Sequence, residues 1–570
     1  MLDRNMMDDV LISNMPESLL RSTLRCMVAQ GEDAQRLFVE HVRDSLRRLD
    51  LPYRPNPSLL RFSVKDGPLP AEFADYVART RCLISCKLMI PAMQYLEILV
   101  GKLVSQEVKW AVGSPLHSAL TELACDVVQA MQALKECELT LRKEDIVPLM
   151  DELDRCNVYC EQNGLDSPFR RSQRQVLDTM HLLLPHEHHI PTKYLDQSPT
   201  LDIASPNQDG IEYFSLGPFR VPRLFNGFWQ LSSPAWGAGS ADAQDLSLAQ
   251  LVQAGFTASD MADHYGDAEL VYGQFRNRLP QQIKEQVFAA TKWCVFRRIG
   301  RPVTNEWVLD AVKERCRRLG GRVELLQFHW YNYNAKEYLD ILVELVSITK
   351  THPELVGAIG LCNFDSDHVQ EACEYLIKKT GAVGLVSNQV QFSVIDSRPL
   401  VRMCGVCERY GLMLLTYGSL CGGFLSSQWQ VECEPMMYGR LTPSQRKYLN
   451  MIQTWDDWNH FQDLLETLST IAAKYKVTLS NVATRWVLQQ PQVGAVIVGT
   501  RLGLTTHEKD NLAVFKFKLT AEDMDDIETA ALWYRKEEMI YRLYDKLGDC
   551  GGEYRKVRVP AMQEEEELSE

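Results

Sequence analysis

The second half of the chain alternates between strand-like and helix-like segments, and this alternation limits the folds that the chain can form. Short apolar runs of strand length recur eight times, and longer stretches with helical periodicity separate them. The runs lie near 225–231, 257–262, 287–293, 323–330, 356–363, 383–390, 413–417 and 495–499. Strands that alternate with helices form parallel sheets, because each crossover needs a long connection. Eight units over roughly three hundred residues predict an α/β fold of the (β/α)8 TIM-barrel type.

An open, doubly wound sheet is the alternative to a closed barrel, since it gives a similar alternation. A dinucleotide-binding sheet of that kind carries a Gly-x-Gly-x-x-Gly loop after its first strand. The glycines after the first strand here, in the run from Trp236 to Gly239, do not follow that spacing. The sequence therefore favours the barrel.

The first part of the chain has a different pattern. Apolar residues follow helical spacing in a stripe from Leu20 to Val28 and in another from Leu120 to Leu134. We expect an all-helical N-terminal domain that buries both stripes within itself. Four parts are predicted along the chain: the helical domain over 1–184, a proline-marked linker over 185–218, the barrel over 219–555 and an acidic disordered tail over 556–570. No catalytic arrangement stands out in the helical part, which leaves partner binding, assembly or control of substrate access as its expected roles.

Composition excludes several classes of protein. A chain of 570 residues exceeds one ordinary core, and 45% hydrophobic with 24% charged residues is typical of a soluble protein. A formal net charge of -14 argues against nucleic-acid binding. The most apolar stretch, 82–103, is interrupted by Lys87, Pro91 and Glu97, so we expect a buried helix and no membrane span. The 16 cysteines are scattered and the N-terminus lacks a signal-peptide pattern, which favours a cytoplasmic location.

Four polar residues follow three successive predicted strands. Asp260 ends the second strand and Tyr265 lies in the loop after it, while Lys292 and His329 end the third and fourth strands. A phenol with an ordinary pKa of about 10 is a weak acid near neutrality unless a cation stabilises its anion. Lys292 can supply that cation, and Asp260 can keep Lys292 charged and in place. Each residue alone has an ordinary structural explanation, but four together at one sheet edge indicate an active site.

Three motifs carry a resemblance to a known family. The run 255–266, the Thr291-Lys292 strand end and the strand end 327–329 resemble those of the aldo-keto reductases, and the resemblance extends from about 219 to about 555. In that family, residues at the four matching positions form a catalytic Asp, Tyr, Lys and His tetrad. The resemblance therefore implies Asp260, Tyr265, Lys292 and His329 as catalytic residues, with no metal required.

Further motifs resemble the nucleotide-binding elements of the family. The resemblance implies NADP as the cofactor, with NAD as the alternative. It implies that the cofactor is bound by Cys362, Asn363, Gln389, Tyr417, Ser419 and Leu420 on the nicotinamide side, and by Arg501, His507 and Asn511 at the adenosine-phosphate loop.

The sequence departs from the family pattern at three positions in these motifs. Cys362 replaces the usual serine, which weakens one hydrogen bond to the nicotinamide carboxamide. Leu502 stands where serine or threonine is common, and His507 stands where arginine is common. Arg501 is then the main expected ligand of a 2'-phosphate.

Two functions from different classes are compatible with these features. The first is an NADP-dependent oxidoreductase that interconverts a small carbonyl compound and an alcohol. Trp229 and Trp330 would line its substrate site, although packing of the barrel explains them equally well. The second is a cofactor-binding regulatory or scaffold protein, in which the barrel senses NADP and the helical domain binds a protein partner.

Overall fold

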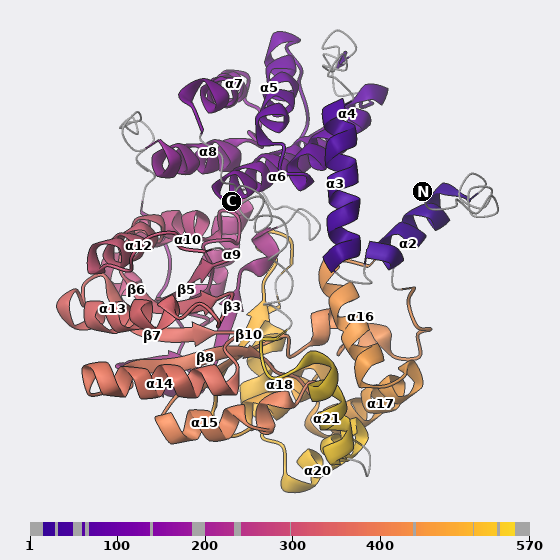
Figure 1. Ribbon diagram of the computed structural model, residues 1–570. Helices are drawn as coiled ribbons and strands as arrows, with labels where there is room; N and C mark the ends of the chain where they lie inside the picture. Colours follow the sequence, from indigo (N-terminus) through magenta and orange to yellow (C-terminus); the bar gives the residue numbers. More distant parts are fainter. Residues whose placement is uncertain are drawn as a thin grey trace, which may run out of the picture.

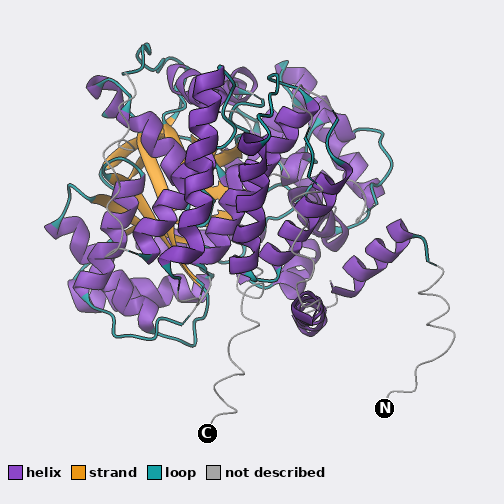
Figure 2. Cartoon of the chain, turned by 90° about the horizontal axis from the view of Figure 1, so that it is seen from above, coloured by secondary structure: helices purple, strands orange, loops and turns teal. Residues whose placement is uncertain are grey.

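The computed structural model describes eleven segments of the chain, which Figures 1 and 2 show from two directions. They are 15–28, 32–48, 60–62, 68–136, 141–184, 200–232, 241–296, 298–436, 441–505, 507–532 and 536–552. The predicted acidic tail lies outside them. A helical region, 15–184, lies next to a larger barrel (Figure 1). Among the described residues, no helix has both the length and the apolar character needed to cross a membrane.

Eight parallel strands close into a barrel, which confirms the predicted (β/α)8 fold. In chain order the strands are β3 (Leu224–Gly227), β4 (Ala258–Asp260), β5 (Phe288–Val295), β6 (Val323–Trp330), β7 (Val356–Cys362), β8 (Leu385–Gln391), β9 (Met413–Tyr417) and β10 (Val493–Gly499). Each strand pairs in parallel with the next, and β10 closes the barrel on β3. All eight predicted strands are present, with ends that differ by a few residues.

Helices surround the strands and bury the main hydrophobic core between the two layers. The helices that connect the strands are α9 (Ala241–Gln253), α10 (Ala268–Asn277), α11 (Gln281–Lys284), α12 (Asn305–Arg318), α13 (Glu337–Thr351), α14 (Ser366–Thr380), α15 (Met403–Tyr410), α16 (Pro443–Trp455), α17 (Trp458–Tyr475) and α18 (Leu479–Leu488). After the last strand come α19 (Glu508–Leu512), α20 (Ala521–Leu532) and α21 (Lys536–Leu547). Side-chain caps start several of these helices, as where Thr304 accepts from the Trp307 amide.

A hairpin closes the amino-terminal end of the barrel. Its strands are β1 (Tyr213–Leu216) and β2 (Phe219–Pro222), which pair antiparallel around a turn at Gly217 with φ of +56°. Leu216 and Val221 are buried in one cluster with barrel-floor residues such as Leu325. The sequence pattern described above does not predict this hairpin. All four residues of β1 pair with the four residues of β2, so the hairpin forms only in a chain that contains both strands.

The predicted linker, 185–218, is only partly a linker. Residues 185–199 lie outside the described segments. From residue 200 onward the chain packs on the barrel: Ile203 is buried in the barrel core, and the Leu201 amide donates to Arg278 O over 2.8 Å. The barrel unit therefore begins near residue 200 and not at 219.

The helical region has a core of its own. Its helices are α2 (Glu17–Val28), α3 (Glu32–Arg48), α4 (Ala71–Ser85), α5 (Met89–Ser105), α6 (Pro115–Lys135), α7 (Lys143–Asn163) and α8 (Arg170–Leu183). The predicted stripe from Leu120 to Leu134 is buried in that core. The stripe on α2 is not, since Leu24 and Met27 are 37% and 58% exposed. The expectation that α2 buries this face within the helical region is therefore wrong.

The helical region contacts the barrel through α6 and α8. In Figure 1 these two helices lie against α10 and α12 of the barrel. Ion pairs link the two parts directly, since Asp178 of α8 binds Arg317 of α12 and Arg171 of α8 binds Asp267 before α10. The contact therefore reaches the loop that follows β4.

Candidate active site

Lys292 and Asp260 form a buried ion pair at the carboxyl end of the barrel strands. Lys292 Nζ lies 2.5 Å from Asp260 Oδ2 and donates to Met261 O over 2.9 Å. Burial alone would lower the pKa of Lys292, but the neighbouring Asp260 carboxylate outweighs it and holds that pKa above its ordinary value. Lys292 is therefore a fixed positive charge at neutral pH.

The second oxygen of Asp260 is held by two glutamines. Gln327 Nε2 and Gln389 Nε2 both donate to Asp260 Oδ1 over 2.8 Å, and Gln389 also donates to Gln327 Oε1 over 2.8 Å. Gln327 was not among the predicted site residues. Its position could have indicated a role in the site. Gln327 lies two residues before His329, and side chains two residues apart on a strand lie on the same face of the sheet. Gln327 also pairs in register with Lys292.

Tyr265 lies in the loop after β4, which we call the Tyr265 loop (residues 261–267). Lys292 Nζ is 4.8 Å from the centre of its ring. Burial raises the pKa of Tyr265 above its ordinary value, and the charge of Lys292 opposes part of that rise. The phenol therefore keeps its proton throughout the neutral range and has a cation beside it.

His329 lies at the end of β6 and is almost fully buried. Its ring contacts Phe296 edge-on, with centroids 5.2 Å apart. Phe296 in turn contacts His264 at 5.3 Å, and His264 contacts Tyr265 at 4.7 Å. The structure thus connects all four predicted catalytic residues: three form a compact group around Lys292, and an aromatic chain leads from Tyr265 to His329.

The predicted nicotinamide residues meet at the ends of β7, β8 and β9. Tyr417 donates its hydroxyl to Asn363 Oδ1 over 2.8 Å, and Asn363 has a left-handed φ of +57°. Cys362 pairs in register with Gln389. Burial raises the pKa of the Cys362 thiol to about 12, with Lys292 opposing and Asp260 adding to the rise. A neutral thiol, an amide and a half-buried phenol ring are chemically suited to a flat ring that carries a carboxamide.

Gln389, a predicted residue of the nicotinamide side, has only one of its two amide atoms available for a cofactor. Its amide nitrogen is taken by Asp260 and Gln327, so the atom suited to a carboxamide N–H is its carbonyl oxygen Oε1. The residue therefore connects the predicted cofactor site to the Asp260 carboxylate.

The loop after β9 contacts the segment that follows β8 and the helix α16. Ser419 donates to Phe392 O over 3.0 Å and is buried, while Leu420 is half-buried. A Cβ on Gly418 would lie 2.2 Å from the hydroxyl of Tyr448 in α16, so this position accepts only glycine. Lys447 of the same helix lies 5.5 Å from the Tyr417 ring. None of the sequence motifs includes Lys447, which lies in α16 between β9 and β10.

The predicted phosphate residues lie after β10. Arg501 and His507 are exposed, and Asn511 is half-buried in α19. Leu502 is buried in the barrel core, and the Gly503 amide donates to Ser247 of α9 over 3.0 Å. The departure at Leu502 therefore has a structural reason: its side chain anchors the loop.

The two predicted substrate tryptophans occupy different environments. Trp330 is 1% exposed, stacks on Phe328 at 5.9 Å and donates to Ala335 O over 3.1 Å. It packs beneath the loop between β6 and α13, so the structure contradicts its predicted contact with substrate. Trp229 is 40% exposed and lies directly after β3 in a 3-10 turn (Trp229–Ser232). It remains a candidate for the substrate side.

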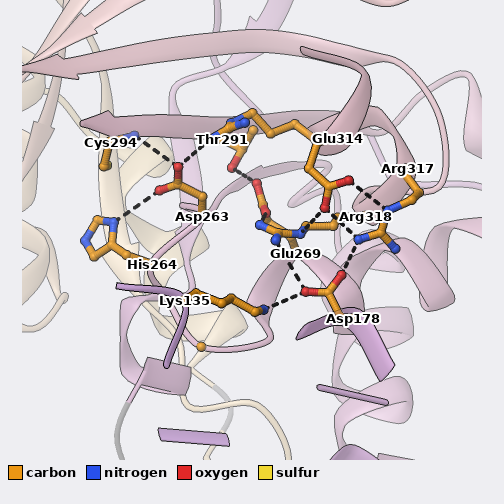
Figure 3. Close-up of polar contacts among 12 residues, drawn as sticks. Lys135, Asp178, Asp263, His264, Glu269, Thr291, Cys294, Glu314, Arg317 and Arg318 are labelled. Carbon is orange, nitrogen blue, oxygen red and sulfur yellow. Dashed lines mark hydrogen bonds and ion pairs between the residues drawn. The ribbon is translucent and has the colours of Figure 1, made fainter. Parts of the chain in front are cut away.

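One group of metal-ligand side chains occurs in the described part of the chain. Ligand atoms of Asp263, His264 and Cys294 lie within 4.8 Å of one another (Figure 3). The Asp263 carboxylate is already bound by Arg315 and by the Cys294 amide. A metal ion would compete with that guanidinium, so we assign these contacts to support of the Tyr265 loop.

The chain is similar to several known proteins. The NADH-specific methylglyoxal reductase of Escherichia coli strain K12 is 24% identical over 329 residues, which cover 53% of this chain and 92% of that protein. Aldo-keto reductase YhdN of Bacillus subtilis strain 168 is 22% identical over 342 residues, 56% of this chain and 93% of that protein. Flagellar radial spoke protein 5 of Chlamydomonas reinhardtii is 24% identical over 182 residues, 29% of this chain and 33% of that protein.

A solved structure was also matched, that of a thermostable aldo-keto reductase in complex with the inhibitor epalrestat. It shows 20% sequence identity and a TM-score of 0.41, and it covers 56% of this chain and 100% of its own. The model of the Aldo/keto reductase family matches residues 223–531, which is more than half of the chain. The chain belongs to the aldo/keto reductase family of oxidoreductases.

Proposed function

We propose that this protein is an NADP-dependent oxidoreductase that reduces aldehydes or ketones to alcohols, or catalyses the reverse reaction, with Tyr265 as the general acid. The observation that supports this most directly is the Lys292 ammonium, held 2.5 Å from Asp260 and 4.8 Å from the Tyr265 ring. A buried acid with a cation beside it is the arrangement that proton transfer to a carbonyl oxygen needs.

In the reduction direction, Tyr265 gives its proton to the substrate oxygen as the carbonyl becomes an alcohol. Lys292 stabilises the phenolate that forms, and Asp260 keeps Lys292 charged. His329 orients and polarises the carbonyl before proton transfer. A nicotinamide cofactor, when bound, would supply the hydride that the carbonyl carbon needs. In the reverse direction the Tyr265 phenolate accepts the alcohol proton.

We assign the nicotinamide side of the cofactor to Asn363, Tyr417, Cys362 and the Oε1 of Gln389. The exposed Arg501 favours NADPH over NADH, because a guanidinium binds a phosphate with charge-assisted hydrogen bonds. One relative is named an NADH-specific methylglyoxal reductase, so both cofactors belong in the test. Methylglyoxal is for the same reason a first substrate to try.

The test uses the purified full chain with NADPH or NADH and a panel of aldehydes and ketones that includes methylglyoxal. We expect carbonyl-dependent oxidation of NADPH, and we expect Tyr265→Phe to lose it while still binding the cofactor. The proposal is contradicted if the protein binds the cofactor and no aldehyde or ketone of the panel causes oxidation of NADPH or NADH.

The second candidate is a cofactor-binding regulatory or scaffold protein. The similarity to a flagellar radial spoke protein favours it, as does the contact of a large helical region with the Tyr265 loop. The same assay separates the two candidates, because a scaffold would bind NADPH and show no turnover that depends on Tyr265.

A further inference from the structure

The Tyr265 loop is held by a residue from outside the barrel. Asp267 ends the loop, and its carboxylate is fully buried but does not cap α10, the helix that it precedes. It binds Arg171 of α8 instead: Arg171 Nε lies 2.7 Å from both carboxylate oxygens, and Nη2 lies 2.6 Å from Oδ1. A second guanidinium, that of Arg174, lies 3.6 Å from Oδ2. The buried charge of Asp267 is thus neutralised by the helical region.

The same arginine also holds the loop after β3. Arg171 Nη2 donates to Leu231 O over 2.8 Å. Leu231 belongs to the short turn that carries Trp229, the remaining candidate for the substrate side. Gln175, one turn further along α8, donates to Gly266 O over 3.4 Å. One guanidinium therefore fixes the loop of the proposed general acid relative to a neighbouring loop of the active-site edge.

A second set of ion pairs keeps α8 in place on the barrel (Figure 3). Asp178 of α8 lies 2.6 Å from Lys135 and 3.3 Å from Arg318 of α12. Arg318 lies 3.3 Å from Glu269, which accepts a hydrogen bond from Thr291 over 2.5 Å. Thr291 precedes Lys292 in β5. Because these charges are buried and paired on both sides, the network resists movement of α8 against the barrel.

We infer that Arg171 is a positioning residue for the reaction proposed above, and that the helical region therefore forms part of the reductase unit. The inference rests on the proposed function. Arg171 acts through Asp267 to hold Tyr265 at the distance from Lys292 that proton transfer requires. A displacement of about 1 Å at a reacting group can cost about a hundredfold in rate. Lysine cannot replace Arg171 fully, because one ammonium does not reproduce the planar fork that binds a carboxylate and a carbonyl together.

Three substitutions in the full chain test this inference. Arg171→Met removes the guanidinium, Arg171→Lys keeps its charge, and Asp267→Asn removes the carboxylate that it binds. Arg170→Met is the matched control, because Arg170 is the preceding residue of α8 and its side chain is 57% exposed. The measurements are kcat, the Kd of NADPH, and hydrogen exchange of peptides from the Tyr265 loop and from β6.

We expect Arg171→Met to lower kcat about 10- to 100-fold and to change the Kd of NADPH less than about twofold. Exchange should become faster in the Tyr265 loop and stay unchanged in β6. Arg171→Lys should give an intermediate kcat, and Arg170→Met should match the parent. Asp267→Asn should resemble Arg171→Met, and the double variant should add little, because both changes break the same contact.

Two results would overturn the inference. One is a folded Arg171→Met variant with parental kcat and parental loop exchange. The other is faster exchange in β6 as well as in the loop, together with a weaker Kd, since that pattern means general loosening of the barrel. If the parent protein shows no turnover, the proposed function fails, and hydrogen exchange still decides whether Arg171 holds the Tyr265 loop.

Discussion

Asp260 Oδ2 lies 2.5 Å from Lys292 Nζ, and both side chains are almost completely buried. The ammonium ion therefore depends on one carboxylate for its charge. We predict that Asp260→Asn lowers kcat at pH 7 at least about tenfold, because burial then lowers the pKa of Lys292 without the Asp260 carboxylate, which is the strongest influence opposing it. The signature is a kcat that rises as the pH falls and Lys292 regains its proton. Gln327→Leu, which leaves the carboxylate intact, is the control and should lack this rise.

The pH dependence of the two reaction directions should differ. Burial raises the pKa of Tyr265 above the ordinary value of about 10, although Lys292 opposes the rise. Reduction needs the protonated phenol, so its rate should stay constant through the neutral range and fall only in strong alkali. Alcohol oxidation needs the phenolate, so its rate should increase with pH. A reduction rate that falls near pH 7 would mean that a different group is the acid.

Cofactor preference should depend on Arg501. We predict that NADPH binds more tightly than NADH, and that Arg501→Ala weakens NADPH binding about 10- to 100-fold while it leaves NADH nearly unchanged. Titration of tryptophan fluorescence gives both Kd values. Lys509→Ala, an exposed charge in the adjacent helix α19, is the matched control. Equal affinities of the parent protein for the two cofactors would contradict the prediction.

The attachment of the helical region should weaken in acid. Burial tends to raise the pKa of Asp178, but Arg318, Lys135 and Arg317 outweigh it and hold that pKa well below its ordinary range. A lowered folded-state pKa stabilises the protein above the unfolded value of about 3.9, and this contribution is lost as the pH falls below it. Asp178→Asn should cost about 3 to 5 kcal/mol at pH 7, because it leaves the buried Lys135 without its carboxylate and removes one of the carboxylates that Arg317 and Arg318 bind. Thermal unfolding of the parent and of Asp178→Asn, measured from pH 3 to pH 8, should show that the difference in stability between the two proteins becomes smaller towards pH 3.

A fragment that begins at residue 200 should fold without the helical region. It keeps Ile203 in the barrel core and retains the hairpin that closes the barrel floor. We predict a cooperative thermal transition that NADPH shifts upward, and measurable but reduced turnover, because Asp267 loses Arg171. An insoluble fragment, or one that does not bind NADPH, would show that the two parts form a single folding unit.

Much of the fold was predictable from local pattern. The strand and helix periods repeat in the correct order, and barrel topology then brings Asp260, Lys292 and His329 to one edge. Asp260 and His329 lie at strand ends that the pattern predicts, and Lys292 lies within β5 three residues before its end, so no long-range information was needed. The same reasoning found Tyr265, because its loop is short.

The remaining features depend on contacts between distant parts of the chain. Trp330 lies at the correct strand end but faces the helices, and a run of buried residues on both faces does not reveal which way a side chain points. The bond between Gln389 and Asp260 joins residues that are 129 positions apart. Arg171 follows no motif, and its proposed role depends on how the helical region and the barrel, which have separate cores, contact each other.

The contact between Arg171 and Asp267 limits how freely this protein can exchange its parts with relatives. The family match begins at residue 223, so the arginine lies outside it and the aspartate lies within it. A chimaera that joins this helical region to the barrel of another reductase needs an acidic residue at the position of Asp267, or it buries two guanidinium groups opposite no charge. Residue 267 is therefore the first position to change when the two parts are recombined.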